Sequence, residues 1–367
     1  MKVSGSFRRD KTMSRFFSKK YDSLTPYTPG EQPKERVYIK LNTNESPFPP
    51  SKKAQKRAAQ ASEQLQLYSD PTCGLLNEKM AEVLGVKSEN VLMTNGSDEI
   101  LNFAFMAFCD EEHPAAFADI TYGFYSVFAN LNGVPYLEIP LNEDFTLPVE
   151  QFMKLPHTLF IANPNAPTGI ALTLSDIERI LESNPDRVVV IDEAYVDFGG
   201  ESAVKLIGKY DNLLVTGTFS KSRSMAGARL GFGVACPQLI GDLNTLKYST
   251  NPYNVNRMTM AAGIGALEDE DYTRENCRKI VATRERTAKA LSALGFTVVP
   301  SLANFLFVKK DGLSGMDFYL KLRQKGILVR HFETKRLKDY NRITIGSDGE
   351  MDAFLKATEE ILKEVEG

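Results

Sequence analysis

The sequence predicts an α/β protein with a large domain, built on a doubly wound and mostly parallel sheet, and a smaller α+β domain. A length of 367 residues corresponds to roughly two domains. In the first part, several short apolar runs end in Gly, Asn, Asp, Ser or Thr and lead into helical patterns, which is the alternation of βαβ units. After about residue 256 the pattern changes to long helical segments followed by a few strands.

Four apolar runs are expected to form strands of the large sheet. The first, Val91–Thr94, continues through Asn95-Gly96 into a helix that begins near Ser97. The others lie in "HTLFIANPNAPTG", "RVVVIDEAY" and "NLLVTGTFSK". Because ligands of open α/β sheets bind beyond the carboxyl ends of the strands, we expect the residues that follow these runs to share one crevice. They are residues 96–98, 163–168, 192–195 and 218–221.

The C-terminal part predicts the smaller domain. The stretch "TMAAGIGALEDEDYTRENCRKIVATRERTAKALSALG" predicts a long helical segment, interrupted only by Gly263 and Gly265. It is followed by predicted strands at Thr297–Val299 and Phe305–Val308, a helix near Met316–Lys325, and "RITIG". "LTPYTPGEQP", near the N-terminus, predicts an extended arm. The expected domains are an arm with part of the small domain at 1–49, a large cofactor-binding domain at 50–255 and a small domain at 256–367.

Composition excludes several classes of function. The net charge is −3 and basic residues are spread along the chain, so we expect no nucleic-acid partner. Four distant cysteines and three scattered histidines favour neither a disulfide framework nor a metal site, and reduced thiols fit a cytoplasmic protein. No apolar run approaches the ~20 residues of a membrane span. The first twenty residues are basic but lack the apolar centre of a signal peptide, which favours a mobile arm, with a transit peptide as the alternative.

Two charged residues are expected at the carboxyl edge of the sheet. Lys221 follows the run Leu213–Val215 and a turn of small residues, where an amine partly removed from water can act as a nucleophile. Asp192 ends the apolar run 188–191, and a buried carboxylate there needs a hydrogen-bonded or cationic partner such as a protonated pyridine nitrogen. The alternatives are a solvated lysine at a helix start and a capping or loop acid. Tyr195 could bring a phenol to the same place.

A phosphate site is expected at the start of the helix after Gly96. Free backbone N–H groups and the positive end of the helix dipole attract anions there, and glycine permits close approach. Ser220 and Arg229 add a hydroxyl and a guanidinium near the lysine. Ser97 and Asp98 could instead serve only as helix-capping residues.

Five motifs in order, "NGSDE", "TYGFYS", "NPNAPTG", "VVVIDEAYVDF" and "TFSKSRSMAGARLGF", resemble those of fold-type-I aminotransferases that use pyridoxal phosphate. The resemblance spans nearly the whole chain. It implies that Lys221 is the Schiff-base lysine and that Asp192 keeps the pyridine nitrogen protonated. Tyr195 would bond the ring oxygen and Tyr122 would stack on the ring. The implied phosphate site comprises Gly96, Ser97, Asp98, Ser220 and Arg229, with Tyr68 reaching it across a homodimer interface, and Thr218 is a further implied cofactor-binding residue.

One position departs from this family pattern. Relatives commonly have Asn immediately before Pro-Thr-Gly, where it bonds the ring oxygen of the cofactor, and this chain has Ala166. Either Asn165, one position earlier, takes over that bond, or Tyr195 makes it alone. The structural alternative for Asn165 is a turn asparagine.

A closer resemblance, to histidinol-phosphate aminotransferases, rests on "LTPYTPG", "LNTNESPFPP", "KYSTNPYNVN", "ANFLFV", "ILVRHF" and "NRITIGS". It implies that Tyr27, Tyr253, Arg330 and Arg342 hold the anionic end of the substrate and that residues 44–47, beginning with Asn44, close the pocket. A bidentate arginine such as Arg342 can take a phosphate in one half-reaction and a carboxylate in the other. For both arginines the alternative is a surface ion pair.

The implied reaction is ping-pong transamination. The amine substrate displaces Lys221, which then moves the α-proton as general base and acid, and 2-oxoglutarate leaves as glutamate. An aromatic-amino-acid aminotransferase and a threonine-phosphate decarboxylase-like enzyme are the alternatives on the same scaffold. A non-enzymatic binding module is disfavoured because Lys221, Asp192 and Arg229 are all present.

Overall fold

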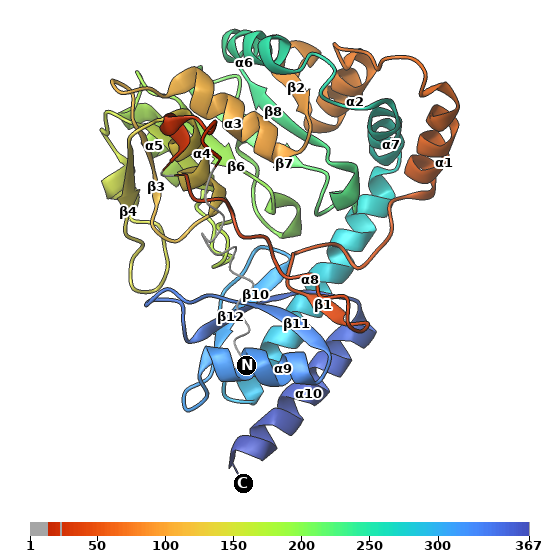
Figure 1. Ribbon diagram of the computed structural model, residues 1–367, viewed down its shortest axis with the longest axis vertical. Helices are drawn as coiled ribbons and strands as arrows, with labels where there is room; N and C mark the ends of the chain where they lie inside the picture. The colour runs from red at the N-terminus through yellow and green to blue at the C-terminus, as the bar shows by residue number, and fades with distance from the viewer. Residues whose placement is uncertain (1–13, 23, 367) are drawn as a thin grey trace.

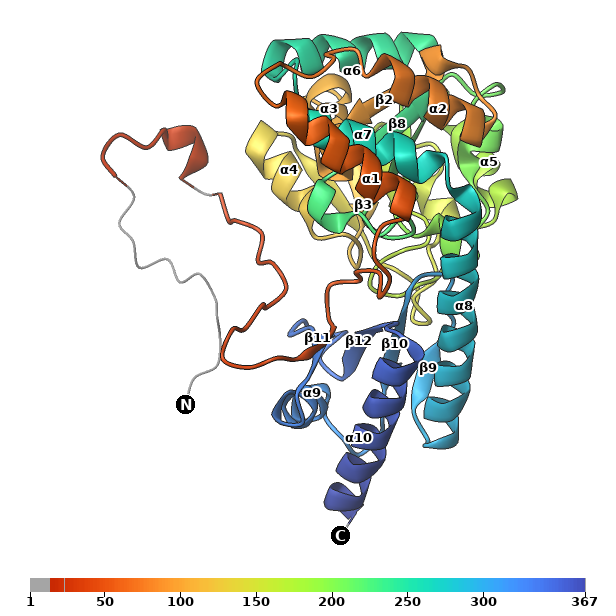
Figure 2. The same ribbon diagram turned by 90° about the vertical axis from the view of Figure 1, so that its right-hand side faces the viewer.

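The computed structural model describes residues 14–22 and 24–366 and contains two sheets within that part of the chain (Figure 1). The seven-stranded sheet has the order β2-β8-β7-β6-β5-β3-β4, and the five-stranded sheet has the order β1-β11-β12-β10-β9. The seven-stranded sheet lies in the upper part of the molecule and the five-stranded sheet in the lower part, and the long helix α8 (Glu270–Ala293) runs from one part to the other (Figures 1 and 2).

The seven-stranded sheet confirms the predicted α/β class. Its strands are β2 (Val91–Thr94), β3 (Ala115–Ala118), β4 (Tyr136–Ile139), β5 (Thr158–Ala162), β6 (Val189–Asp192), β7 (Leu213–Thr218) and β8 (Gly231–Ala235). Strands β3 to β7 pair in parallel, whereas β8 is antiparallel to both β2 and β7. The sheet is therefore mostly parallel, with one reversed strand inside it.

Glycines explain why the sequence did not predict β8. A Cβ on Gly231 would lie 2.3 Å from the backbone of Gly96 and Ser97, and one on Gly233 would lie 2.8 Å from Ile100. Strand β8 thus lacks two side chains that a strand pattern would show, because the first turn of α3 packs directly on it. This contact fixes the start of α3 at the sheet.

Helices cover both faces of this sheet, as a doubly wound fold requires. Alternate residues of a strand point to opposite faces, so Val189 and Ile191 belong to one apolar cluster and Val190 to the other. The first face is covered by α2 (Gly74–Leu84), α5 (Leu174–Ser183) and α7 (Arg257–Leu267); the second by α3 (Ser97–Phe108), α4 (Phe124–Asn132) and α6 (Pro237–Thr250). Helix α1 (Lys52–Ala61) packs against α7.

The long helical segment is interrupted elsewhere than predicted. Gly263 and Gly265 both lie inside α7, and the break falls at residues 268–269, before α8. The glycines serve close packing, since a Cβ on Gly265 would lie 2.7 Å from the backbone of Ala54 in α1, and one on Gly263 would lie 2.5 Å from Leu230. Because α7 shares the core of the seven-stranded sheet, we propose that the small domain begins after α7 rather than at residue 256.

The five-stranded sheet forms the centre of the small domain. Its strands are β1 (Ile39–Leu41), β9 (Thr297–Val299), β10 (Phe305–Lys309), β11 (Ile327–His331) and β12 (Tyr340–Thr344), and α8, α9 (Gly315–Gln324) and α10 (Asp348–Glu366) pack against it. The strands predicted at 297–299 and 305–308 and the helix predicted at 316–325 are confirmed to within one residue, whereas "RITIG" overlaps β12 with an offset of two residues. Strand β1 pairs in parallel with β11, which joins the N-terminal segment to this domain.

Residues 24–33 have no regular structure, in keeping with an extended arm, and the segment before β1 runs outside the body of the molecule (Figure 2). Of the first twenty residues, 1–13 lie outside the described residues; Lys19 begins a short 3-10 helix that ends at Tyr21. Within residues 14–22 and 24–366, no helix combines the length and the apolar character that a bilayer span requires.

Candidate active site

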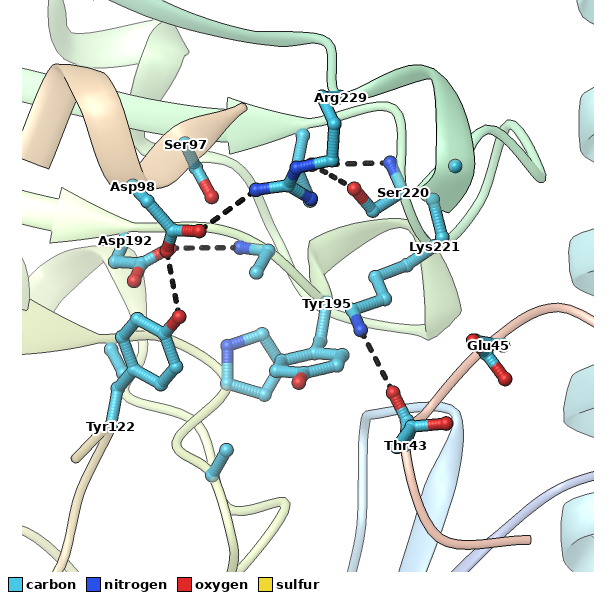
Figure 3. Close-up of a pocket in the computed structure, with 17 residues that line it drawn as sticks. Thr43, Glu45, Ser97, Asp98, Tyr122, Asp192, Tyr195, Ser220, Lys221 and Arg229 are labelled. Carbon is cyan, nitrogen blue, oxygen red and sulfur yellow. Dashed lines mark hydrogen bonds and ion pairs between the residues drawn. The ribbon is translucent and has the colours of Figure 1, made fainter. Parts of the chain in front are cut away.

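A cavity of about 320 Å³ opens at the carboxyl ends of β5, β6 and β7 (Figure 3). Each of the four predicted loop segments contributes to it, through Ser97, Pro164, Asp192 and Lys221 among others. The arm residues Thr43 and Glu45 close one side. The prediction that these chain segments share one crevice is confirmed.

Lys221 points into this cavity from the turn after β7 (Figure 3). Its Nζ atom donates to the carbonyl oxygen of Thr43 at 3.2 Å and lies 5.8 Å from the centre of the Tyr195 ring. It forms no ion pair with any described residue, so its amine is held in place without being neutralised.

Asp192 lies at the end of β6 with only 5% of its surface exposed. Its carboxylate accepts hydrogen bonds from the Tyr125 hydroxyl at 2.9 Å and from the backbone N–H of Ala194 at 3.2 Å. Burial raises the pKa of Asp192 to about 6, against the lowering effect of these two hydrogen bonds. A cationic ligand nitrogen facing the carboxylate would favour its ionised form.

The residues expected for an anion site lie together at the start of α3. Gly96 has a φ of 77°, and a Cβ there would lie 2.6 Å from the Nη2 atom of Arg229, so only glycine lets the guanidinium approach. The Arg229 Nη2 atom donates to Asp98 Oδ2 at 2.8 Å. Across the cavity, the Thr218 hydroxyl donates to the Ser220 hydroxyl at 2.9 Å. The N–H groups at the helix start, the hydroxyls and one guanidinium thus line the same part of the cavity.

Two tyrosines line the walls of the cavity. The Tyr122 hydroxyl donates to Asp98 Oδ1 at 2.7 Å, so Asp98 joins Tyr122 to Arg229 (Figure 3). Tyr195 packs edge-on against Phe305, with ring centres 5.1 Å apart, and its hydroxyl accepts from Asn44 Nδ2 at 3.0 Å.

Asn165 does not face this cavity, contrary to one of our expectations. Its amide donates to the Ile120 carbonyl at 3.0 Å and to the Thr168 hydroxyl at 3.1 Å, and its Oδ1 accepts from the Thr121 hydroxyl at 2.8 Å. These bonds use the side chain to hold the turn, while Ala166 lines the cavity instead. Of the two side chains predicted to bond a ring oxygen, Tyr195 lines the cavity and Asn165 does not.

A second cavity, of about 580 Å³, adjoins the first and shares Thr43, Tyr122, Ala166, Tyr195 and Lys221 with it. Four predicted substrate residues line it: Tyr27, Asn44, Arg330 and Arg342. The two arginines are paired neighbours on β11 and β12.

Neither arginine forms an ion pair with any residue in the described ranges. Burial lowers the pKa of Arg342, although a guanidinium stays charged in proteins. Its Nη2 atom donates to the Asn42 carbonyl at 3.1 Å, while its buried Nε has no partner in the described structure. A cation that lacks an acidic partner is costly to bury, so this wall of the cavity is positively charged and incompletely satisfied by the described residues.

Tyr68 and Tyr253 lie outside both cavities. Their side chains are 79% and 42% exposed, and their rings stack 4.6 Å apart on the surface. Leu65 and Leu67 beside them are also exposed. Tyr253, expected at the substrate, therefore does not line the cavity of its own chain, and neither does Tyr68, which was expected to reach a partner's cavity.

Sequence reasoning missed Tyr125 and Thr43. Tyr125 lies in the first turn of α4, whereas Tyr122 precedes that helix, so no helical spacing links the two; the signal in the sequence was the place of Tyr125 in the motif "TYGFYS". Thr43 acts through its backbone carbonyl, for which no side-chain signal exists. In the described ranges, no group of three or more His, Cys, Asp or Glu side chains could hold a metal ion, and the four cysteines are free.

The fold and the site define an enzyme with a reactive amine and a buried carboxylate that line one cavity, with an anion cradle at its edge. The comparisons identify the family. The chain belongs to the aminotransferase class I and II family, whose model matches residues 36–357.

Relatives cover nearly the entire chain. Histidinol-phosphate aminotransferase of Brachyspira hyodysenteriae is 48% identical over 353 residues, which is 96% of this chain and 100% of that protein. The enzyme of the same name from a Marinomonas species is 49% identical, over 94% of this chain and 99% of its own length. Histidinol-phosphate aminotransferase of Sinorhizobium meliloti, solved with pyridoxal 5'-phosphate, superimposes with a TM-score of 0.86 at 24% identity, covering 96% and 99% of the two chains.

Proposed function

We propose that this chain is a pyridoxal-5'-phosphate-dependent aminotransferase that acts on L-histidinol phosphate and 2-oxoglutarate. The observation on which this rests is the pair of unneutralised arginines, Arg330 and Arg342, in a cavity continuous with Lys221. Relatives that share close to half of the sequence bear the name of this activity.

The first cavity suits the proposed cofactor. Asp192 is the acid that would face a pyridine nitrogen, and its raised pKa is the cost of burial that a cationic nitrogen would relieve. Ser97, Ser220 and Arg229 would hold the phosphate, and the Tyr195 phenol would bond the ring oxygen. When bound, the cofactor supplies an electron sink that stabilises negative charge at the substrate α-carbon.

Side chains of the protein would then transfer one proton inside the cavity. Lys221 is the general base and acid, because its amine lies in the wall shared by the two cavities. The hydrogen bond to the Thr43 carbonyl orients that amine, and the arm segment that contains Thr43 and Asn44 covers it from solvent.

The arginines would select the substrate. Arg342 presents a planar guanidinium suited to bidentate binding of phosphate, and the same group can bind a carboxylate of 2-oxoglutarate in the second half-reaction. One pocket can therefore serve both substrates of a ping-pong reaction.

A homodimer is part of the proposal. Tyr68, with the exposed Leu65, Leu67 and Tyr253, forms a surface that cannot serve its own cavity, which supports a role at the cavity of a second subunit. We expect the purified protein to sediment as a dimer, and Tyr68→Phe to weaken cofactor binding about fivefold through loss of one hydrogen bond. A monomer that retains full activity would contradict this arrangement. A cytoplasmic location remains part of the same proposal.

Steady-state rates with L-histidinol phosphate, phenylalanine, tyrosine and glutamate test the substrate assignment. We expect the highest kcat/KM for L-histidinol phosphate. If the aromatic amino acids rank above it, the proposed substrate is wrong while the aminotransferase class stands. Release of carbon dioxide from a phosphorylated amino acid, without conversion of the cofactor to its amine form by glutamate, would favour the decarboxylase alternative.

A further inference from the structure

The loop between β11 and β12, residues 332–339, lies along the substrate-side cavity and is fixed to the large domain. The Arg336 guanidinium donates to the carbonyl oxygens of Leu141 and Asn142 at 3.0 and 2.7 Å and lies 3.3 Å from the Asp119 carboxylate. It also lies 5.5 Å above the ring of Phe145. These contacts join the two domains at the rim of the cavity, so the loop has a defined position there.

The charges along this cavity are one-sided. Five cationic side chains and a single carboxylate line it, and that carboxylate, Asp119, is already paired with Arg336. The cations are Lys221, Arg330, Lys335, Arg336 and Arg342. Lys335 is exposed, adjoins Arg336 in the loop, and forms no ion pair with a residue in the described part of the chain.

We propose that Lys335 is a specificity-determining residue, which adds a third unpaired positive charge beside Arg330 and Arg342 and so favours a substrate with a phosphate dianion over one with a carboxylate. The inference rests on the proposed function, because it concerns the anionic end of the same substrate. Arg336 acts as the positioning residue that holds the loop, and Lys335 with it, at the cavity rim.

The preference follows from the charge of the ligand. A phosphate monoester has a charge of about −1.5 to −2 at neutral pH, whereas each carboxylate has a charge of −1. A fixed cation at the rim therefore attracts the phosphate up to twice as strongly. Because Lys335 is exposed, its effect is expected to be modest and to weaken as salt screens it.

The chain offers a matched control within the same loop. Lys338 is exposed and makes no ion pair in the described structure, but it does not line the cavity. We therefore compare Lys335→Gln with Lys338→Gln in the cofactor-loaded enzyme. Lys335→Gln should raise KM for L-histidinol phosphate about threefold to fivefold with kcat unchanged, and should change KM for glutamate less than twofold. Lys338→Gln should match the wild type with both substrates.

Two further measurements distinguish an effect of the Lys335 charge from an effect of the substitution on folding. Lys335→Glu should raise KM for the phosphorylated amine more than Lys335→Gln does, and 0.5 M NaCl should reduce both effects. The inhibition constant of inorganic phosphate, measured with glutamate as the amine donor, should rise for Lys335→Gln and not for Lys338→Gln. This last measurement tests Lys335 even if the physiological amine proves to be different.

Equal kinetic constants for Lys335→Gln and Lys338→Gln, with unchanged phosphate inhibition, would overturn the inference. The same holds if Lys335→Gln raises KM for glutamate as much as for the phosphorylated amine, because Lys335 would then not discriminate between the anions. The proposed function fails separately, when the wild-type enzyme prefers aromatic amino acids.

Discussion

The two adjoining cavities differ in how their charges are satisfied. Around the cofactor cavity, Asp98 is bonded to Arg229 and Tyr122, and Asp192 is bonded to Tyr125 and Ala194, so each acid already has its partners. Along the substrate cavity, Arg330, Arg342 and Lys335 have no acidic partner among the described residues. This difference fits the proposed function, in which the cofactor stays bound in the first cavity and two substrates exchange in the second.

The difference also follows from the fold. The cofactor cavity is built mainly by strand ends and one helix start of a single sheet, where Asp98 and Asp192 find hydrogen-bond donors within the same domain. The substrate cavity lies between the arm, the large domain and β11 and β12 of the small domain, so its cations can be completed by the ligand itself. Substitutions in the cofactor cavity should therefore mainly lower kcat, and those in the substrate cavity should mainly raise KM.

Lys221→Ala should have the largest effect. Loss of the proton-transferring amine alone is expected to lower kcat about 10²–10⁴-fold, and the loss of the attachment point adds to this. The measurements are single-turnover rates and borohydride reduction of the loaded protein, which should no longer fix the cofactor covalently. Covalent fixation at an unchanged position in this variant would show that another amine is the attachment point.

Asp192→Asn should come next. The amide has no charge to hold a ring nitrogen cationic, so kcat should fall about 10²–10³-fold, the range for removal of one preorganised electrostatic partner. Cofactor content and the absorbance spectrum should be recorded with kcat, since Tyr125 can still hydrogen-bond to the amide. Asp197→Asn, close in sequence but outside the cavity lining, is the control and should retain wild-type kcat. Wild-type activity in Asp192→Asn would remove Asp192 from the mechanism.

Arg342→Ala should act on binding. Loss of charge-assisted hydrogen bonds should raise KM for L-histidinol phosphate about tenfold to a hundredfold, with a smaller change in kcat. Arg342→Lys retains the charge without the planar fork, so its KM should lie between those of the wild type and Arg342→Ala. If kcat falls while KM is unchanged, the proposed contrast between the two cavities does not hold.

The predictable parts of the site are side chains placed by strand ends. Lys221 and Asp192 follow apolar runs directly, and parallel strands bring such residues to one edge whatever the details of the loops. Gly96 and Ser97 were predictable for a similar reason, because a glycine before a helix start is a local signal.

The parts that sequence could not predict depend on which way a side chain turns and on contacts between distant segments. Asn165 lies in the expected loop, but its amide turns toward Ile120 and Thr168 and away from the cavity. Gly265 looked like a helix break and is instead the contact point of α7 with α1. The sequence does not show that Tyr68 is exposed, or that it lies away from the cavity of its own chain; only the folded structure does.

Glu193 offers the finest test, because it neighbours Asp192 but lies outside the cavity. Its carboxyl accepts from the Ser202 hydroxyl and the Ala203 N–H, both at 2.6 Å, and burial raises its pKa to about 8 from 4.5. Between pH 4.5 and 8 the folded protein keeps a proton that the unfolded chain has lost, so this residue makes the free energy of unfolding fall as pH rises.

Glu193→Gln should remove that dependence, which is at most about 1.4 kcal/mol per pH unit, while leaving kcat within about twofold because no site residue changes charge. In urea unfolding from pH 5 to pH 8, the midpoint of the wild type should therefore fall relative to that of the variant as pH rises. Glu201→Gln, an exposed acid nearby that pairs with Lys205, is the control and should follow the wild type. Parallel curves for all three proteins would mean that Glu193 is ionised throughout this range. The strand end would then place two buried negative charges side by side, and the proposed interaction with a cationic ring could not be assigned to Asp192 alone.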